Sequence, residues 1–206
     1  MTFVRILLFI LLPLASQLSI AKQATILVMG DSLSAGYGIQ LEQSWVTLLQ
    51  QDLAKTTQAK VINASVSGET SSGGLTRLPA LLKKHGPDIV IIELGGNDGL
   101  RGQPINIMQN NLQSMITASQ TAGAEVILAG MQIPPNYGPR YTKQFQETYT
   151  KLAEKNSISL VPFLLEDVAA HGNLIQRDGI HPTAEAQPLI LKNVLPVLMP
   201  LLTNVK

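Results

Sequence analysis

The serine at position 32 stands where an apolar run of strand length ends. The run Thr25–Met29 is followed directly by Gly30-Asp31-Ser32-Leu33-Ser34. A serine at the end of a buried strand can be a nucleophile if a base takes its proton, a carboxylate orients the base and donors stabilise the resulting oxyanion. Without those partners, a serine at a helix start is usually no more than an N-cap. The function of Ser32 therefore depends on what the rest of the chain supplies.

The candidate base and carboxylate come late in the chain, in Arg177-Asp178-Gly179-Ile180-His181-Pro182. A spacing of three residues, on a turn that leads into a helix, can bring the Asp178 carboxylate to one imidazole nitrogen of His181. The other nitrogen then faces the serine. An Asx-turn beside a surface histidine is the alternative. His85 and His171 fit less well, because His85 lies at an expected helix C-terminus and His171 lacks a carboxylate in similar register.

Two loops offer donors for an oxyanion. The loop Asn63–Thr70, which contains Gly68, follows the second expected strand, and Gly95–Asp98, which contains Asn97, follows the third. A glycine lets its backbone N–H approach a ligand closely, and an asparagine amide is a neutral donor that does not compete as a nucleophile. A turn glycine and an Asx-turn are the alternatives. The place of both residues after neighbouring strands favours an oxyanion hole.

The elements that must position these residues alternate between strand and helix. Unalternated apolar runs such as Ile89–Ile92 are typical of strands that are buried on both faces. The expected strands are Thr25–Met29, Lys60–Val66, Asp88–Leu94, Glu125–Gly130 and Ser159–Phe163. The expected helices are Ser44–Lys55, Gly74–Lys84, Ile105–Thr121, Thr142–Lys155 and one from about Thr183, which Pro188, Pro196 and Pro200 would bend or interrupt.

This alternation predicts an α/β fold with a five-stranded, mostly parallel sheet covered by helices in three α/β/α layers. In such sheets the ligand binds beyond the carboxyl ends of the strands. Ser32, Gly68 and Asn97 each follow an expected strand end, so we expect them to meet at one edge of the sheet.

The first residues have the features of a secretory signal. Met1–Ala21 contains one basic residue, Arg5, followed by the apolar run Ile6–Ala15 and small residues before the expected cleavage site. The apolar run is shorter than the roughly 20 residues that span a bilayer. We therefore expect cleavage near Ala21, a periplasmic or secreted protein, and one domain over residues 22–206. An uncleaved N-terminal anchor is the alternative.

Charge and cysteine content argue against several other classes. Without the leader, the chain has 14 basic and 14 acidic residues, so no strong field attracts nucleic acid or an anionic membrane. The absence of cysteine excludes thiol catalysis and Cys-ligated metals. No glycine-rich phosphate-binding pattern follows the first strand, and Ser34 occupies the place of the second glycine in a G-x-S-x-G elbow.

These residues together resemble the SGNH, or GDSL, hydrolases, whose serine, glycine, asparagine and histidine lie in four separate blocks. All four blocks are present in order over residues 30–182. The resemblance implies a flavodoxin-like SGNH hydrolase fold. It also implies that Ser32 is the nucleophile, His181 the base and Asp178 the carboxylate that orients the base.

The resemblance further implies two-step acyl transfer, with the oxyanion held by the Ser32 N–H, the Gly68 N–H and the Asn97 side chain. No metal or organic cofactor is needed for this chemistry. The expected partner is a small-molecule acyl ester or thioester. We expect no nucleic acid, no stable membrane anchor, and a monomer.

In its segment Met131–Gly138 and its compact length, the chain is similar to the periplasmic group of multifunctional thioesterases, lysophospholipases and arylesterases. In that group the loop after the asparagine block, here 99–104, shifts when an acyl chain binds. The similarity implies an apolar channel lined by Leu100, Ile133, Pro134 and Tyr137. Ordinary packing of surface loops is the alternative for these residues.

An exported enzyme would meet lysophospholipids and other lipid or aryl esters rather than acyl-CoA. The short loops between the elements predict an open groove and broad acyl specificity. Two other classes remain open from the sequence. A carbohydrate O-deacetylase on the same fold would share every catalytic residue, and a binding module would have the fold without the activity.

Overall fold

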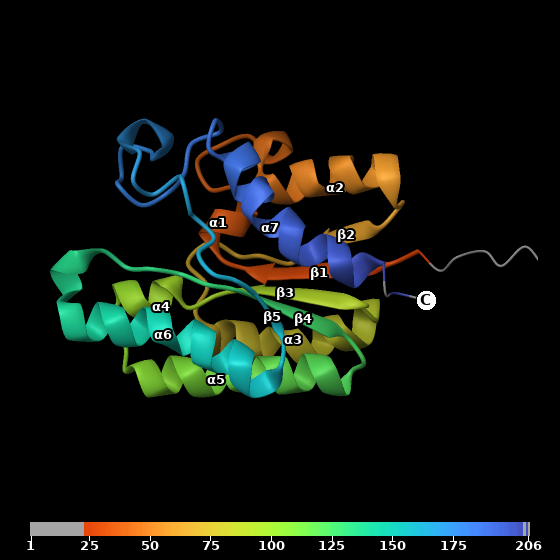
Figure 1. Cartoon of the computed structure of the whole chain (residues 1–206), viewed down its shortest axis with the longest axis horizontal. Coiled ribbons are helices and arrows are strands. Elements are labelled where there is room, and N and C mark those ends of the chain that lie inside the picture. The colour runs from red at the N-terminus through yellow and green to blue at the C-terminus, as the bar shows by residue number, and fades with distance from the viewer. Residues whose placement is uncertain (1–22, 204, 206) are drawn as a thin grey trace, which may run out of the picture.

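The computed structural model describes residues 23–203 and residue 205 of the 206-residue chain (Figure 1). The expected leader, Met1–Ala21, lies outside the described residues, so the leader and the domain boundary at residue 22 stay predictions. Within the part of the chain that the structure describes, no helix is long and apolar enough to cross a membrane.

Five strands form one sheet in the order β2-β1-β3-β4-β5. They are β1 (Thr25–Gly30), β2 (Lys60–Asn63), β3 (Ile89–Glu93), β4 (Glu125–Ala129) and β5 (Ser159–Val161). Every neighbouring pair is parallel, and the register of β1 and β3 places Gly30 opposite Glu93. The α/β prediction is confirmed, and the described sheet is parallel throughout.

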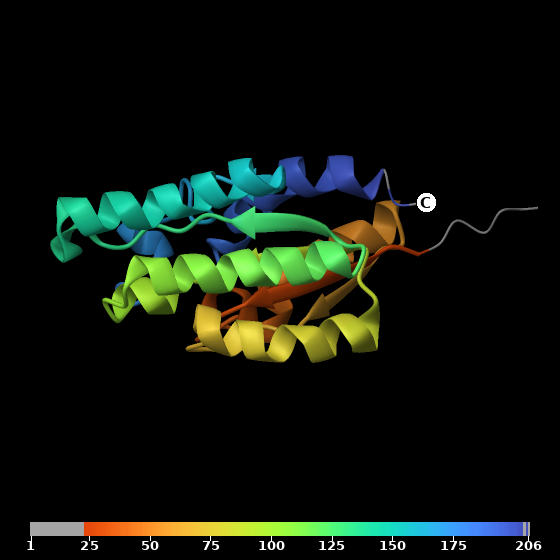
Figure 2. The same cartoon turned by 90° about the horizontal axis from the view of Figure 1, so that it is seen from below.

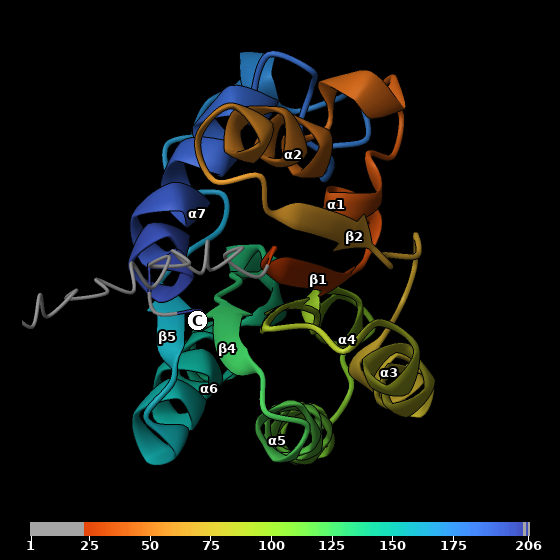
Figure 3. The ribbon, with the colours of Figure 1, turned by 90° about the vertical axis from the view of Figure 1, so that its right-hand side faces the viewer.

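Helices cover both faces of this sheet, which gives the predicted three layers. The long helices are α2 (Trp45–Thr56), α3 (Ser71–His85), α5 (Ile105–Thr121), α6 (Pro139–Asn156) and α7 (Gln187–Leu202). Helices α2 and α7 pack together on one face (Figure 3). Helices α3, α5 and α6 lie side by side on the other, with α5 in the middle (Figure 2).

The hydrophobic core lies between the sheet and these two helical layers. Ile26–Met29 of β1 and Ile89–Ile92 of β3 are fully buried, as expected for strands covered on both faces. The largest buried side chains are Trp45 of α2 and the pair Phe145 and Tyr149 of α6, whose rings meet edge to face. The central strands therefore form a rigid support for the loops at their carboxyl ends.

β2 and β5 end earlier than predicted, whereas β1 continues one residue further, to Gly30. β2 ends at Asn63 rather than Val66, and β5 ends at Val161 rather than Phe163. Beyond β2, the Val66 N–H still donates to the Gly30 carbonyl oxygen at 3.0 Å. This bond holds the loop after β2 over the end of β1.

Two short helices are not among the helices expected from the sequence, because four or five residues are too few to carry a periodic signal. They are α1 (Ser32–Ala35) and α4 (Gly96–Leu100), and the short 3₁₀ turns η1 (Leu41–Gln43), η2 (Pro135–Tyr137) and η3 (Gly172–Leu174) lie in loops.

The last helix differs from the prediction at its start and in its continuity. α7 begins at Gln187 rather than Thr183, because residues 183–186 form turns. Pro188 lies in its first turn, where a missing N–H costs no helical bond. The prolines do not interrupt the helix, since α7 continues through Pro196 and Pro200 as one helix, and the bend weighed beside an interruption stays a prediction.

At the end of β4, Gly130 passes close to the chain leaving β5. A Cβ atom there would overlap the carbonyl oxygen of Pro162 and lie 2.9 Å from that of Val161. Because backbone atoms cannot swing aside, we expect Gly130→Ala to lower the free energy of unfolding by about 1–3 kcal/mol in urea titrations. Gly172→Ala is the control, since no atom lies within 4 Å of a Cβ at that site. Equal stability of the two variants would contradict this close approach.

Candidate active site

The ends of β1 and β3 bring two of the predicted site residues to one edge of the sheet. Ser32 is the first residue of α1, just beyond the end of β1, and Asn97 lies in α4, just beyond the end of β3. These strands are parallel neighbours, and α1 and α4 lie at the same end of the sheet (Figure 1). This is the edge at which such folds bind ligands.

Asp31, not Ser32, caps helix α1. The Asp31 Oδ1 atom accepts a hydrogen bond from the Leu33 N–H at 3.0 Å. The Ser32 hydroxyl instead lies 2.8 Å from Nε2 of His181. The cap that the sequence suggested for position 32 is therefore supplied by its neighbour, and the Ser32 hydroxyl contacts the candidate base.

Asp178 contacts the second ring nitrogen of His181. Its Oδ2 atom lies 2.6 Å from Nδ1 of His181. Its Oδ1 atom accepts the backbone N–H groups of Ile180, at 2.9 Å, and His181, at 3.0 Å. The Asx-turn weighed as an alternative and the carboxylate–imidazole contact thus occur together, because each uses a different oxygen of the same carboxylate.

The same hydrogen bonds fix the charge of Asp178. The backbone N–H of His181, the His181 ring and the backbone N–H of Ile180, in that order, lower the pKa of Asp178 to about 2. The carboxylate is therefore ionised at neutral pH, and its Oδ2 atom can accept a hydrogen bond from an N–H at Nδ1 of His181. This tautomer, assigned from the hydrogen bonds, leaves Nε2 free to take the Ser32 proton.

Tyr37 and Gln176 also contact His181, although neither was predicted as a site residue. The Tyr37 ring centroid lies 4.4 Å from that of His181. The Gln176 side chain donates to the carbonyl oxygens of Tyr37 and Pro182, both at 2.9 Å, and its backbone N–H donates to His181. No periodicity or motif marks these two residues, because both lie in loops that only the fold brings together.

The candidate oxyanion donors are also fixed by hydrogen bonds. The Asn97 side-chain amide donates to Oδ2 of Asp31 at 3.0 Å. Gly68 has φ of +79°, which favours glycine, and its carbonyl oxygen accepts a bond from Arg101 at 3.0 Å.

A second polar contact ties the Gly68 loop to helix α4. Buried Asp98 accepts the backbone N–H of Ser71 at 2.8 Å and its hydroxyl at 2.6 Å. Asn111 of α5 also donates to the Ser71 hydroxyl. Since Ser71 begins α3, this contact fixes the chain just after Gly68 relative to Asn97.

Two buried carboxyl groups lie behind Ser32. Asp31 and Glu93 are 2% and 0% exposed. Burial raises the pKa of Asp31 to about 6, while hydrogen bonds from Leu33 and Asn97 oppose the rise. Burial, and then the nearby Asp31 charge, raise the pKa of Glu93 well above its usual value. Because two negative charges are costly in so dry a site, this environment favours a protonated Glu93 beside a charged Asp31.

A cavity of about 460 Å³ opens beside Ser32 and His181. Leu100, Ile133 and Pro134, three of the four predicted channel residues, line it. Tyr137 lies outside this lining, and its hydroxyl donates to the Leu100 carbonyl oxygen at 2.7 Å. The cavity therefore adjoins the reactive groups directly.

Residues from the long connection between β5 and α7 complete the cavity wall. They comprise the apolar residues Phe163, Leu165, Ala169, Ile175 and Ile180, together with Gly179 and His181. The five apolar residues were not predicted, because the described connection contains no regular element longer than a single turn.

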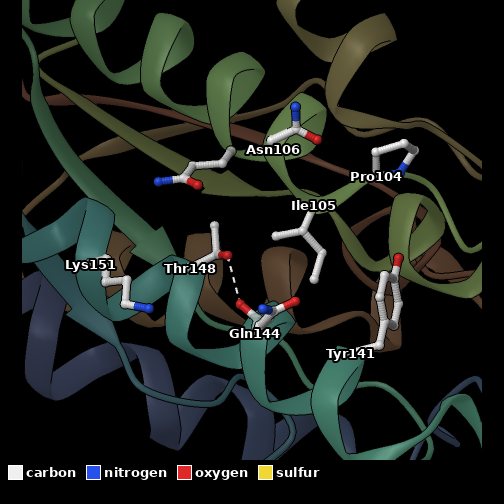
Figure 4. Close-up of a pocket in the computed structure, with 8 residues that line it drawn as sticks. Pro104, Ile105, Asn106, Tyr141, Gln144, Thr148 and Lys151 are labelled. Atoms are coloured by element: carbon white, nitrogen blue, oxygen red, sulfur yellow. Dashed lines mark hydrogen bonds between the residues drawn. The ribbon is translucent and has the colours of Figure 1, made fainter.

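A second hollow, of about 450 Å³, lies between α5 and α6 (Figure 4). Amides and Lys151 line much of it, and the Thr148 hydroxyl beside it donates to the Gln144 carbonyl oxygen at 2.8 Å. It shares no residue with the cavity beside Ser32. The two hollows are therefore separate.

The other histidines lie elsewhere. His85 ends α3, at the opposite end of that helix from Ser71, and His171 precedes η3. Among the described residues, no group of three or more His, Asp or Glu side chains is arranged to hold a metal ion.

Comparison with known proteins agrees with this geometry. Residues 28–188 match the GDSL-like lipase/acylhydrolase family. The chain is 51% identical to esterase TesA of Pseudomonas aeruginosa, over 88% of this chain and 91% of that protein. It is 43% identical to thioesterase 1/protease 1/lysophospholipase L1 of Escherichia coli K12, over 89% and 88%.

A solved structure extends the similarity to three dimensions. The psychrotrophic esterase EstA from Pseudoalteromonas sp., in a form inhibited by monoethylphosphonate, superposes with a TM-score of 0.84. It is 46% identical and covers 88% of this chain and 100% of that one. The chain belongs to the GDSL-like lipase/acylhydrolase family, as the four blocks predicted, and by that membership is an ester hydrolase.

The buried proton on Glu93 makes stability depend on pH. The folded state keeps this proton above the usual carboxyl pKa of 4.5, whereas the unfolded state releases it. The contribution of this proton to the free energy of unfolding is therefore complete below pH 4.5. It is lost as the pH rises toward the pKa of Glu93 in the folded state. We expect Glu93→Gln to gain stability over the wild type by up to about 1.4 kcal/mol per pH unit above 4.5.

Urea unfolding between pH 4 and 8 measures this difference. Glu42→Gln, at an exposed carboxyl of η1, is the control and should follow the wild type at every pH. A difference between Glu93→Gln and the wild type that stays constant with pH would show that Glu93 is ionised in the folded state.

Proposed function

We propose that this ester hydrolase works through an acyl-enzyme, with Ser32 as nucleophile, His181 as general base and Asp178 as the carboxylate that orients the base. One observation carries the proposal. Hydrogen-bond contacts of 2.8 and 2.6 Å run from the Ser32 hydroxyl through both His181 nitrogens to Asp178. A serine hydroxyl is a weak nucleophile unless such a base removes its proton.

In the first step, Ser32 Oγ attacks the ester carbonyl carbon while His181 Nε2 takes the hydroxyl proton. The imidazolium that forms is stabilised by the ionised Asp178. Collapse of the tetrahedral intermediate breaks the bond to the leaving group, which receives the proton from His181. The products of this half-reaction are the free alcohol and an acyl ester on Ser32.

In the second step, water replaces the alcohol. His181 removes a proton from water as its oxygen attacks the acyl carbon, and then returns that proton to Ser32 Oγ. The released product is the carboxylic acid. Both steps use protein groups and water, and each restores His181 to its neutral form.

The oxyanion formed in each step is held by the N–H groups of Ser32 and Gly68 and by the Asn97 side chain. An asparagine amide has two hydrogens on its nitrogen. In Asn97 one of them bonds to Asp31, which leaves the second for the oxyanion. The bond to Asp31 thus orients this donor before substrate arrives.

The cavity beside Ser32 supports an acyl chain as its occupant. Leu100, Ile133 and Pro134 give it apolar walls, so we assign them to substrate binding. An apolar wall favours lipid and aryl esters or thioesters over a hydrated sugar ester. The cavity therefore gives no support to the carbohydrate O-deacetylase alternative.

Names of relatives support the same range of substrates. They include an esterase, an arylesterase from Vibrio mimicus and a thioesterase/lysophospholipase. The expected leader would export this chain to the periplasm or beyond, away from cytoplasmic acyl-CoA. We therefore propose lysophospholipids and aryl esters as its main substrates there.

The proposal predicts that Ser32→Ala loses hydrolysis of a short-chain chromogenic ester. Turnover should fall at least 1000-fold, because the hydroxyl that contacts His181 is lost, while the unfolding midpoint stays close to that of the wild type. Ser114→Ala, on the exposed face of α5, is the matched control and should keep full activity. Residual turnover in Ser32→Ala near the wild-type level would rule out this nucleophile.

Asn97→Ala tests the oxyanion hole. We expect kcat to fall about 100- to 1000-fold with little change in KM, because the lost bond acts mainly in the transition state. Steady-state kinetics on the same ester measure both constants. An unchanged kcat, or a loss confined to KM, would show that Asn97 does not stabilise the oxyanion.

A further inference from the structure

Glu93 is a fully buried acid that the mechanism above does not use. It ends β3, and its Oε2 atom accepts two hydrogen bonds, from the Ser34 hydroxyl at 2.6 Å and from the Asp31 backbone N–H at 3.2 Å. Its other oxygen, Oε1, is buried and has no hydrogen-bond partner. A carboxyl group in this place costs free energy, so its position calls for an explanation.

The protonation of this acid follows from its neighbours. Hydrogen bonds stabilise the negative charge of Asp31, since one of its oxygens accepts from Leu33 and the other from Asn97. Glu93 has donors at one oxygen only, and burial and the Asp31 charge raise its pKa. A neutral Glu93 can carry its proton on Oε1 while Oε2 accepts both bonds.

We propose that Glu93 is a positioning residue for the oxyanion hole and acts through Asp31 on Asn97. Its uncharged carboxyl group accepts the backbone N–H of Asp31 and so fixes the position of that residue. The Asp31 carboxylate, placed in this way, holds the Asn97 amide at 3.0 Å with its second hydrogen directed to the reaction. The inference rests on the proposed roles of Ser32 and Asn97.

The sequence around Ser32 is adapted to this contact. Gly30 lies opposite Glu93 in the β1–β3 register. A Cβ atom at position 30 would lie 2.6 Å from the Glu93 Oε2 atom and 2.8 Å from the Ser34 hydroxyl. The glycine before Asp31 therefore leaves the space in which the Glu93 carboxyl and Ser34 meet.

Two substitutions at Glu93 separate positioning from charge. Glu93→Gln keeps an oxygen acceptor without any charge, whereas Glu93→Leu has a similar shape and removes the acceptor. If Glu93 acts as proposed, Glu93→Gln keeps kcat within about 3-fold of the wild type, and Glu93→Leu lowers kcat about 10-fold or more with KM within about 2-fold.

Ser34→Ala provides a milder test that leaves the Glu93 side chain in place. It removes one of the two bonds to Glu93 and should lower kcat about 3-fold. Ser119→Ala is matched to it, because Ser119 is also a fully buried serine, on α5, and bonds to the Met115 carbonyl oxygen. The control should lose stability with kcat unchanged.

The decisive measurement places Glu93→Leu in an Asn97→Ala background. If Glu93 acts through Asn97, the two losses in kcat are not multiplied, and Glu93→Leu changes the Asn97→Ala enzyme less than about 2-fold. Losses that multiply, a wild-type kcat in Glu93→Leu, or a Glu93→Gln enzyme as slow as Glu93→Leu would each overturn the proposal.

If Glu93→Leu does not fold, the same double-mutant comparison is made with Ser34→Ala. Ser34→Ala must then lower kcat in the wild type and leave the Asn97→Ala enzyme unchanged, and any other result overturns the proposal. An active Ser32→Ala enzyme would instead refute the proposed function, which keeps the two failures distinguishable.

Discussion

The parallel pairing of β1 with β3 is the constraint on which the site depends. It places Gly30 opposite Glu93, and so brings the two loops that follow these strands together at one edge. Ser32 comes from the first loop and Asn97 from the second, and Asp31 joins them through its side chain. A shift of either strand by one residue would reverse the direction of its side chains and separate these groups.

Around this edge, three carboxyl groups have different environments and different tasks. Asp178 is partly exposed and accepts three hydrogen bonds, which keep it ionised beside His181. Asp31 is buried but hydrogen-bonded at both oxygens, and we assign it the charge that orients Asn97. Glu93 is more deeply buried, and its surroundings raise its pKa and favour the protonated form. Burial and hydrogen bonding thus give these three carboxyl groups different preferences for charge.

Much of the fold could be predicted from the sequence because its signals are local. Apolar runs of strand length predicted the five strands, and α5 has the predicted bounds Ile105–Thr121. The start of α7 could not be predicted in this way. Turns at 183–186 replace helix there.

The residues of the candidate site likewise differ in whether a local sequence signal predicts them. The spacing of Asp178 and His181 indicated their contact, because three residues on a turn restrict the geometry. Glu93 gave no such signal, since its partners lie 59 and 62 residues away and meet it only through the strand register. The cavity wall between β5 and α7 was likewise missed, because its residues belong to an irregular connection.

The central claim is that the fold activates one serine, and covalent labelling tests it directly. The protein is treated with a fluorophosphonate, which reacts with activated serine hydroxyls, and the adduct is located by peptide mass spectrometry. The account predicts one adduct per chain, on Ser32, formed at least 100-fold more slowly in His181→Ala. Labelling at another residue, or at Ser32 with the same rate in His181→Ala, would contradict it.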